Sequence, residues 1–188
     1  SAQKEPLVGV LVNWDNEAIW AAMSVRGKDE FRQRPISARV GVSRALINAN
    51  VPFEYVTADD LRNGLAARYP TIYLPAMLAI NHDLQEILET YVQNGGHLVM
   101  DLPSAWYDEY SAMLPTGEGN WLERVFGTKL NDFHYSGHNR QYHLQGEPLQ
   151  GFTARMTPTR ADLLAYYDNQ QAAVTRHQVG EGRATLLA

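Results

Sequence analysis

Hydrophobic and polar residues alternate along the first two thirds of the chain in a pattern that predicts strands separated by helices. Continuous apolar runs or period-two alternation predict strands at 7–12, 53–57, 71–75 and 97–101. Apolar residues at helical spacing predict helices over 36–49, 82–94 and 121–126. Strands that are connected by helices pair in parallel through right-handed crossovers. The pattern therefore predicts a three-layer α/β sandwich.

The helices carry further local signals. One face of the helix over 36–49 is formed by Ile36, Val40, Ser43 and Ile47. Asn81 is expected to cap the next helix, and Gly95 and Gly96 to end it. The segment from Asn13 to about Arg34 shows no clear period and is predicted to be a polar, aromatic loop.

The pattern changes after Gly127. Short strand-like pieces separated by glycines and polar turns occur at 135–144, 152–156, 163–167, 172–179 and 183–187. They predict antiparallel β structure that extends the parallel sheet. We expect a parallel α/β core over 7–127 and a β-rich extension of the same domain over 128–188. Strand-like sequence close to both ends leads us to expect a piece excised from a larger chain.

Composition narrows the possible functions. The 188 residues include no cysteine, which excludes disulfides, thiolate metal sites and cysteine nucleophiles. A net charge of −5 argues against a nucleic-acid partner, and no apolar run is long enough for a membrane-spanning helix. A TIM barrel, which needs about 250 residues, does not fit. We expect a cytoplasmic protein.

Candidate chemistry lies at the carboxyl ends of the predicted parallel strands, where ligands bind in such sheets. The residues there are 13–17, 75–77 and 101–104. They include no glycine-rich nucleotide turn, no phosphate loop and no phosphoacceptor aspartate. Asp15, Glu17 and Asp101 form a candidate acid/base group, and solvated or capping carboxylates are the alternative.

Other constellations are weaker. His134, His138 and His143 have ligand-like spacing, but the sequence around them predicts a strand and a turn rather than a helix. A nucleophilic serine motif is also missing. We therefore expect no metal, no cofactor and no autonomous active site.

Aromatic residues gather in or beside the two predicted long loops. They are Trp14, Trp20, Trp106, Tyr107, Tyr110 and Trp121, with Met23 and Met113 nearby. Exposed Trp, Tyr and Met are typical of interface cores. The alternatives are loops that bury their own aromatics and tryptophans that stack on carbohydrate.

Several stretches resemble a known family. They are 10–20 (VLVNWDNEAIW), 46–56 (LINANVPFEYV), 72–78 (IYLPAML), 88–99 (LETYVQNGGHLV) and 172–184 (AAVTRHQVGEGRA). The order of elements resembles the flavodoxin-like fold of class I glutamine amidotransferases. Within that fold, the chain resembles the middle, trimerisation domain of glycoside hydrolase family 42 β-galactosidases.

The resemblance implies a non-catalytic module. In that family the catalytic glutamates lie in a preceding barrel domain, and this domain joins subunits into a homotrimer and helps to wall neighbouring active sites. True amidotransferases place a cysteine after the third strand, where this chain has Ala76-Met77-Leu78. The loop over 106–119 departs from the family pattern and keeps only Asp108-Glu109. The expected partners are other copies of the chain and the catalytic barrel of the parent enzyme.

Two functional hypotheses remain open at this point. The first is the assembly module, with its interface or cleft drawn from Asn13, Trp14, Asp15, Trp20, Asp101, Trp106, Tyr107 and Tyr110. The second is an independent small-molecule or sugar-binding domain that uses the cleft beside Asn13, Asp15 and Asp101. An unrecognised hydrolase ranks third.

Overall fold

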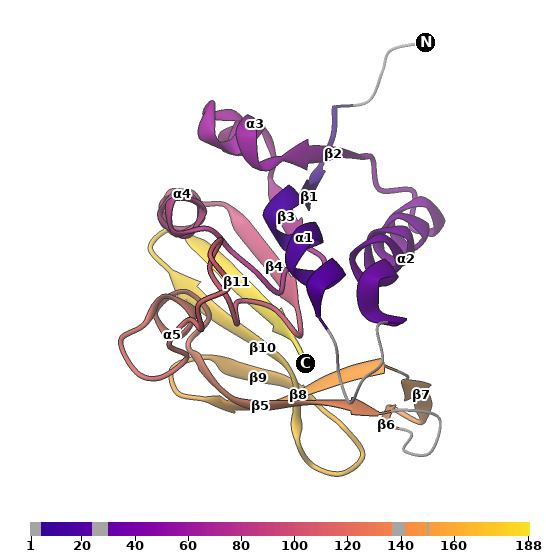
Figure 1. Ribbon diagram of the computed structural model, residues 1–188. Helices are drawn as coiled ribbons and strands as arrows, with labels where there is room; N and C mark the ends of the chain where they lie inside the picture. Colours follow the sequence, from indigo (N-terminus) through magenta and orange to yellow (C-terminus); the bar gives the residue numbers. More distant parts are fainter. Residues whose placement is uncertain (1–4, 24–29, 137–141, 150) are drawn as a thin grey trace.

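The fold is built on one seven-stranded sheet, seen obliquely in Figure 1. The computed structural model describes residues 5–23, 30–136, 142–149 and 151–188. Along the sheet the order of strands is β2 (Phe53–Thr57), β1 (Val8–Val12), β3 (Thr71–Leu74), β4 (His97–Asp101), β11 (Gly182–Leu187), β10 (Ala172–Val179) and β9 (Asp162–Tyr166). The first five are parallel, and β10 and β9 continue the sheet antiparallel. The predicted α/β sandwich with a C-terminal antiparallel extension is confirmed.

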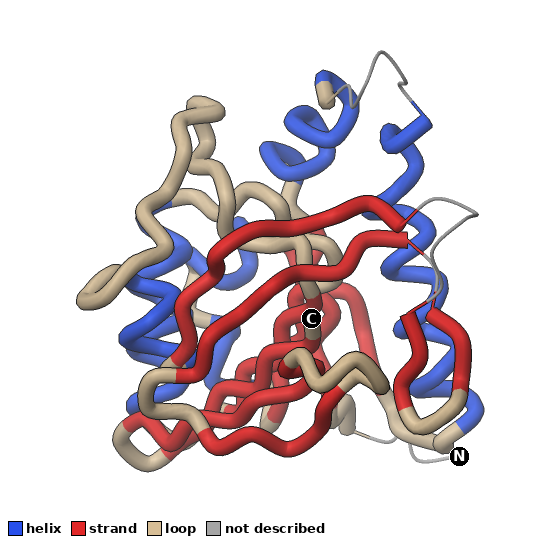
Figure 2. The backbone as a smooth tube through the Cα atoms, turned by 90° about the horizontal axis from the view of Figure 1, so that it is seen from below, coloured by secondary structure: helices blue, strands red, loops and turns tan. Residues whose placement is uncertain are grey.

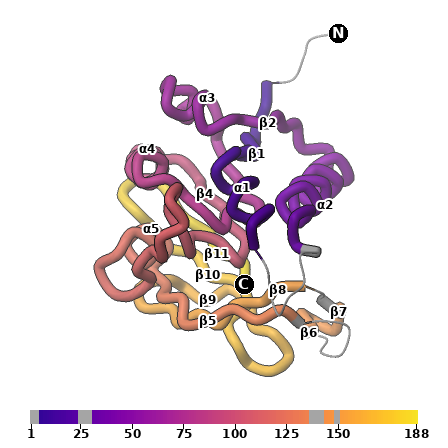
Figure 3. Tube along the Cα trace, viewed as in Figure 1, coloured from indigo at the N-terminus to yellow at the C-terminus, as the bar shows by residue number. Residues whose placement is uncertain are grey.

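The last strand of the chain lies inside the sheet, between β4 and β10 (Figure 3). Its register pairs Leu186 with Met100 on β4. The two sequence segments, 7–127 and 128–188, therefore share one sheet. Gly182 makes this docking possible, because a Cβ there would lie 2.0 Å from the carbonyl oxygen of Val92 at the end of α4.

Helices lie on both sides of the sheet. They are α1 (Trp14–Ala22), α2 (Arg34–Asn48), α3 (Ala58–Arg62), α4 (His82–Gln93) and α5 (Trp121–Phe126), with 3₁₀ turns η1 (Glu30–Gln33) and η2 (Leu65–Arg68). Figures 1 and 2 show α4 and α5 together on one side and α2 on the other. This arrangement gives the three layers that the sequence predicts.

A second, two-stranded ribbon crosses the molecule below the main sheet (Figure 2). It pairs β5 (Thr128–Ser136) with β8 (Gly151–Pro158), and a short hairpin pairs β6 (Tyr142–Leu144) with β7 (Glu147–Leu149). Phe152 of β8 contacts the rings of Trp20, Phe31 and Phe133. The ribbon therefore closes the core on the side of α1.

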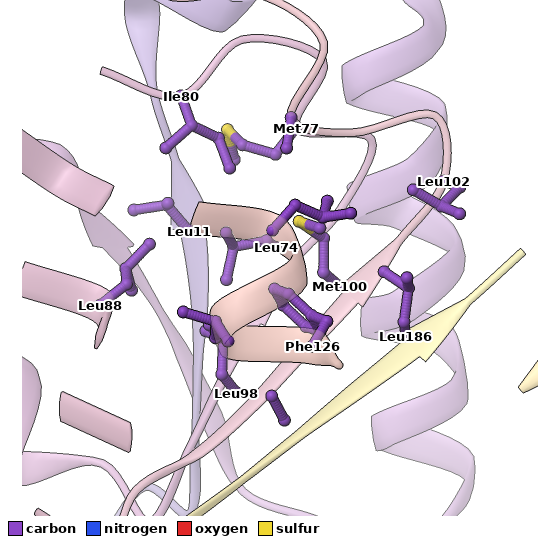
Figure 4. Packing of buried hydrophobic residues seen from close by; sticks show 14 of the residues in the cluster. Leu11, Leu74, Met77, Ile80, Leu88, Leu98, Met100, Leu102, Phe126 and Leu186 are labelled. Atoms are coloured by element: carbon purple, nitrogen blue, oxygen red, sulfur yellow. The ribbon is translucent and has the colours of Figure 1, made fainter. Parts of the chain in front are cut away.

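Buried aliphatic side chains from the central strands meet helices in one continuous core (Figure 4). Alternate residues of β3 and β4 point into it, and Leu88 of α4 and Phe126 of α5 close it from one side. Burial of such side chains stabilises the fold by ~1.5–3 kcal/mol each.

A buried carboxylate fixes the first turn of α5 against the loop that precedes β9. Glu123 accepts hydrogen bonds from Thr159, Arg160 and the backbone N–H of Gly119. The hydrogen bond from the Thr159 hydroxyl and, as a smaller contribution, the Arg160 guanidinium lower the pKa of Glu123 to about 2. The sequence predicts this helix correctly but gives no sign of this network.

Two local predictions are wrong. Residues 14–22, expected in a loop, form helix α1, because Asn13 adopts an extended N-cap conformation and accepts a hydrogen bond from the Asp15 N–H. The strand expected over 135–144 is divided between β5 and β6, and residues 137–141 lie outside the described part of the chain. The predicted face of α2 lies on a helix, and Ile36, Val40 and Ile47 on this face are exposed.

Candidate functional site

The carboxyl edge of the sheet carries most of the predicted site residues, and a chain of amide side chains joins them. Asn13, at the end of β1, donates from Nδ2 to Oδ1 of Asn81 at 2.9 Å. Asn81 in turn donates to Asp15 at 2.6 Å. Asn81 occupies the N-cap position of α4, but its side chain makes no capping bond because these residues engage it. Asn13 and Asp15 thus tie α1 to the start of α4.

The turn after β3 has the backbone conformation of an elbow. Ala76 has a φ of +44°, which is unfavourable for a residue with a Cβ. Its carbonyl oxygen accepts hydrogen bonds from Asn16 Nδ2 at 3.2 Å and Trp20 Nε1 at 2.8 Å. Its N–H donates to Asp101. Contacts from α1 and β4 therefore hold the elbow, and its side chain is a buried methyl group rather than a nucleophile.

Asp101, at the end of β4, is the most perturbed carboxyl of this edge. Burial raises the pKa of Asp101 to about 6, against the lowering effect of the Ala76 N–H and of Arg34. The Tyr73 hydroxyl donates to its second oxygen at 3.3 Å, and burial likewise raises the pKa of Tyr73. A carboxyl with such a pKa can exchange protons near neutral pH. One carboxylate oxygen of Asp101, however, already accepts a hydrogen bond from the Ala76 N–H.

Each of the three candidate carboxylates has a hydrogen-bond or ion-pair partner within the domain. Asp15 is bonded to Asn81, and Asp101 to Ala76 and Tyr73. Glu17 forms an ion pair with Arg39 of α2. The hydroxyl of Ser104 is also engaged, because it accepts from Met77 N–H at 2.9 Å and donates to the carbonyl of Asp101. Each group thus has a structural partner of its own.

The predicted aromatic residues divide into buried and exposed sets. Trp20 is fully buried and Trp106 nearly so, which corrects the expectation that they lie at an interface or cleft. Tyr107 is half-buried and joins Ala79 and Met113 through backbone bridges. In contrast, Trp14 is 72% and Tyr110 82% exposed, and Met113 is also exposed. Trp14, Tyr110 and Met113 are called the loop patch below.

Polar contacts connect the two parts of the loop patch, which are Trp14 on α1 and the loop that carries Tyr110 and Met113. His82 follows Asn81, and its Nδ1 lies 3.2 Å from Oε2 of Glu109. Asp108 shapes the same loop by accepting the N–H groups of Tyr110 and Ala112. Trp14 and Tyr110 are therefore linked through Asp15, Asn81, His82 and Glu109. Asn81 and His82 also belong to this edge, although the sequence predicts only a helix cap for Asn81 and no role for His82.

Ligand atoms of His82, Asp108 and Glu109 lie within 4.8 Å of one another, so these residues could hold a metal ion. Their hydrogen bonds already account for the shape of the loop. Of the predicted histidines, His134 pairs with Asp132 and His143 lies on β6, while His138 is outside the described residues.

A groove of about 720 Å³ lies at the opposite edge of the sheet, between η2 and the end of α4. Arg68, Tyr69, Thr90 and Asn94 line it, and Glu86 is the one carboxylate among its lining residues. Arg68 pairs with Glu54, and the Tyr91 hydroxyl donates to the Tyr69 carbonyl. No residue expected at a site from the sequence lines this groove.

The described helices include none that is long and apolar enough to cross a membrane. The fold and the edge together define a flavodoxin-like α/β domain whose elbow after β3 carries alanine. A family model described as the β-galactosidase trimerisation domain matches residues 8–188. The chain belongs to this family.

Known relatives agree with this assignment. β-Galactosidase LacZ of Lactobacillus acidophilus is 23% identical over 188 residues, which cover 96% of this chain and 27% of that protein. Gan42B, a family 42 β-galactosidase from G. stearothermophilus, superposes with a TM-score of 0.84 at 22% identity, over 99% of this chain and 28% of its own. The β-galactosidase from Bacillus circulans sp. alkalophilus gives a TM-score of 0.84 at 19% identity, over 100% of this chain and 29% of its own. The chain thus spans less than a third of the length of these relatives.

Proposed function

We propose that this domain assembles a β-galactosidase-like glycoside hydrolase into a homotrimer, and that bond cleavage takes place in another part of the parent polypeptide. The observation that carries the proposal is the loop patch. Exposed Trp and Tyr on a firmly held edge are costly in water and typical of interface centres. The family assignment and the names of the relatives point to the same kind of parent enzyme.

The state of the strand-end residues supports a non-catalytic role. A nucleophile at the elbow would need a reactive side chain at Ala76, which has only a methyl group. Asp101 and Ser104 are occupied with backbone groups of neighbouring loops. These contacts are suited to holding the edge rigid, and a rigid edge presents its aromatic residues without a loss of conformational entropy on binding.

We further propose that the loop patch helps to wall an active site of the assembled enzyme. Trp14 offers an exposed, flat apolar face of the kind on which a sugar ring stacks. Such a face suits a sugar as well as a protein surface. In this role the patch contributes to substrate binding but supplies no reacting group.

The independent sugar-binding alternative has less support. The residues proposed to bind the sugar already form hydrogen bonds with other groups of the protein; they are Asn13, Asp15 and Asp101. Isothermal calorimetry of this chain with galactosides tests it directly. Binding that disappears in Asp15→Ala would favour this alternative over the assembly module.

Light scattering across a range of protein concentrations tests the main proposal. It should be applied both to this chain and to the natural polypeptide that carries it. We expect three times the monomer mass for the natural polypeptide. The isolated domain should dissociate on dilution, because it keeps only part of the interface between subunits. A natural polypeptide that stays monomeric at every concentration would refute the proposal.

A further inference from the structure

Helix α2 exposes apolar side chains that the domain itself does not cover. Ile36, Val40 and Ile47 share one face by helical spacing, and their side chains are between 45% and 64% exposed. Only Pro35 and Ser43 of this fifteen-residue helix are buried. A surface helix normally turns its apolar stripe toward the core. The apolar stripe of α2 is therefore exposed to solvent in this domain.

The edge strand β2 continues this apolar surface. The Tyr55 side chain is also half exposed, and its hydroxyl lies 2.8 Å from the Ser43 hydroxyl of α2. Strand β2 ends the sheet on this side, so nothing in the sheet covers Tyr55. Ile36, Val40, Ile47 and Tyr55 are called the helix patch below. It lies beside β2, whereas the 107–113 part of the loop patch lies over the ends of β3 and β4.

The two patches carry opposite charges. The charged residues of α2 are all arginines, of which Arg39 pairs with Glu17 of α1 and Arg44 is exposed. Between Arg68 and Arg124 the chain has acidic residues but no lysine or arginine. Asp15, Asp108 and Glu109 border the loop patch. Opposite charges around two apolar centres favour contact between them over contact of either patch with its own copy.

A closed ring of three identical subunits requires two different surfaces on each subunit. In cyclic symmetry above twofold, the contact is head-to-tail, so one surface of a protomer meets a second surface of the next. This inference rests on the proposed trimer. We propose that the loop patch of one copy docks on the helix patch of the next, with Trp14 and Tyr110 packing against α2 and β2. A second copy of the chain is thus the occupant of the helix patch.

A complementation experiment tests this pairing in the natural polypeptide that carries the domain. The loop variant carries Trp14→Ser and Tyr110→Ser, and the helix variant carries Val40→Asp and Ile47→Asp. All four side chains are exposed, so both variants are expected to keep the fold, which circular dichroism and thermal melting check. Leu164→Asp on β9 is the matched control, because Leu164 is 48% and Val40 49% exposed.

Sedimentation velocity and native mass spectrometry then read the assembly state. At a concentration where the unmodified protein is a trimer, we expect each variant alone to be monomeric and the control to stay trimeric. Loss of hot-spot residues should weaken association by at least tenfold. A mixture of the two variants keeps one intact loop-to-helix contact, so it should form heterodimers of one copy each and no larger species.

The remaining outcomes overturn the inference in distinguishable ways. Trimers in either variant would show that its patch is not part of the ring contact, while the trimer proposal stands. A mixture that remains monomeric would show that the patches do not meet each other. A folded loop variant or helix variant that dimerises alone would indicate self-contact of the remaining patch. A monomeric unmodified protein would overturn both this inference and the proposed function.

Discussion

Replacement of Asp101 by asparagine tests whether this carboxyl at the strand ends has a structural role. In the folded protein the pKa of Asp101 is about 6, against an ordinary value of 3.8, because burial disfavours its charged form. Asparagine keeps an acceptor for the Ala76 N–H and carries no charge at any pH. We therefore expect Asp101→Asn to be more stable than the unmodified chain at pH 8.

The size of the effect follows from the two pKa values. A folded-state pKa above the unfolded one means that the native state binds the proton more tightly. The contribution of Asp101 to stability is thus fully present below pH 3.8 and is lost as the pH rises through 6. The difference of about two between the pKa values corresponds to a loss of ~3 kcal/mol, which the asparagine variant escapes. Below pH 4 the two proteins should be nearly equal.

Urea unfolding followed by tryptophan fluorescence at pH 4, 6 and 8 measures this difference. Asp162→Asn on the exposed edge strand β9 is the control, and we expect it to change stability little at any of these values. The reasoning fails if Asp101→Asn destabilises the protein at pH 8, or if its effect is the same at pH 4 and pH 8. Destabilisation at pH 8 alone would mean that the folded protein needs the charged carboxylate, and an equal effect at pH 4 and pH 8 would mean that the ionisation of Asp101 has no influence on stability.

Three further predictions concern the fold. Glu123→Gln should destabilise the fold by ~2 kcal/mol at pH 7, because it weakens the charge-assisted hydrogen bonds from Thr159 and Arg160. The pKa of Glu123 is lowered to about 2, so the difference between the two proteins in urea unfolding should shrink as the pH falls below 4.5. Gly182→Ala should destabilise by ~3 kcal/mol or prevent folding, because its Cβ would collide with the carbonyl of Val92, and a normal thermal midpoint would contradict the docking of α4. Gly41→Ala on exposed α2 meets no atom within 4 Å and should stabilise by ~0.5–1 kcal/mol in the same assay, whereas a loss would show that α2 is not a regular helix there.

The parts of the fold that depend on local pattern could be predicted from the sequence. The continuous apolar run of β1 and the stripe of α4 are complete within their own segments. Strands connected by helices then fix the parallel sheet, because the handedness of the crossover leaves few alternatives. The insertion of β11 beside β4 depends on pairing between distant residues, and no local pattern reports it.

Helix α1 was missed although its signals are present. Asn13 is a good cap, and Asp15 and Glu17 suit the first turn of a helix. Asn16 and Trp20 are four residues apart and both buried, which is the helical spacing that a loop assignment ignores. Trp14 lies two residues before Asn16 and consequently points away from the core. The exposure of Trp14 and the burial of Trp20 could have been predicted once the helix was recognised.

The site was predicted only as far as its location. The ends of β1, β3 and β4 do meet at one edge, as parallel strands require. The sequence could not show that Asp101 bonds to the backbone of Ala76 or that Asn81 engages Asp15, since these contacts join loops far apart in the chain. It also could not show that the apolar face of α2 remains open, because its residues alone fit a buried helix equally well.

Sedimentation equilibrium of the natural polypeptide that carries this domain tests the central claim most directly. Its mass should be compared with that of the same polypeptide containing the loop variant. Three times the monomer mass for the first and the monomer mass for the second are predicted, because the exposed aromatic residues hold the subunits together. Equal masses for the two would contradict the claim that this surface assembles the enzyme.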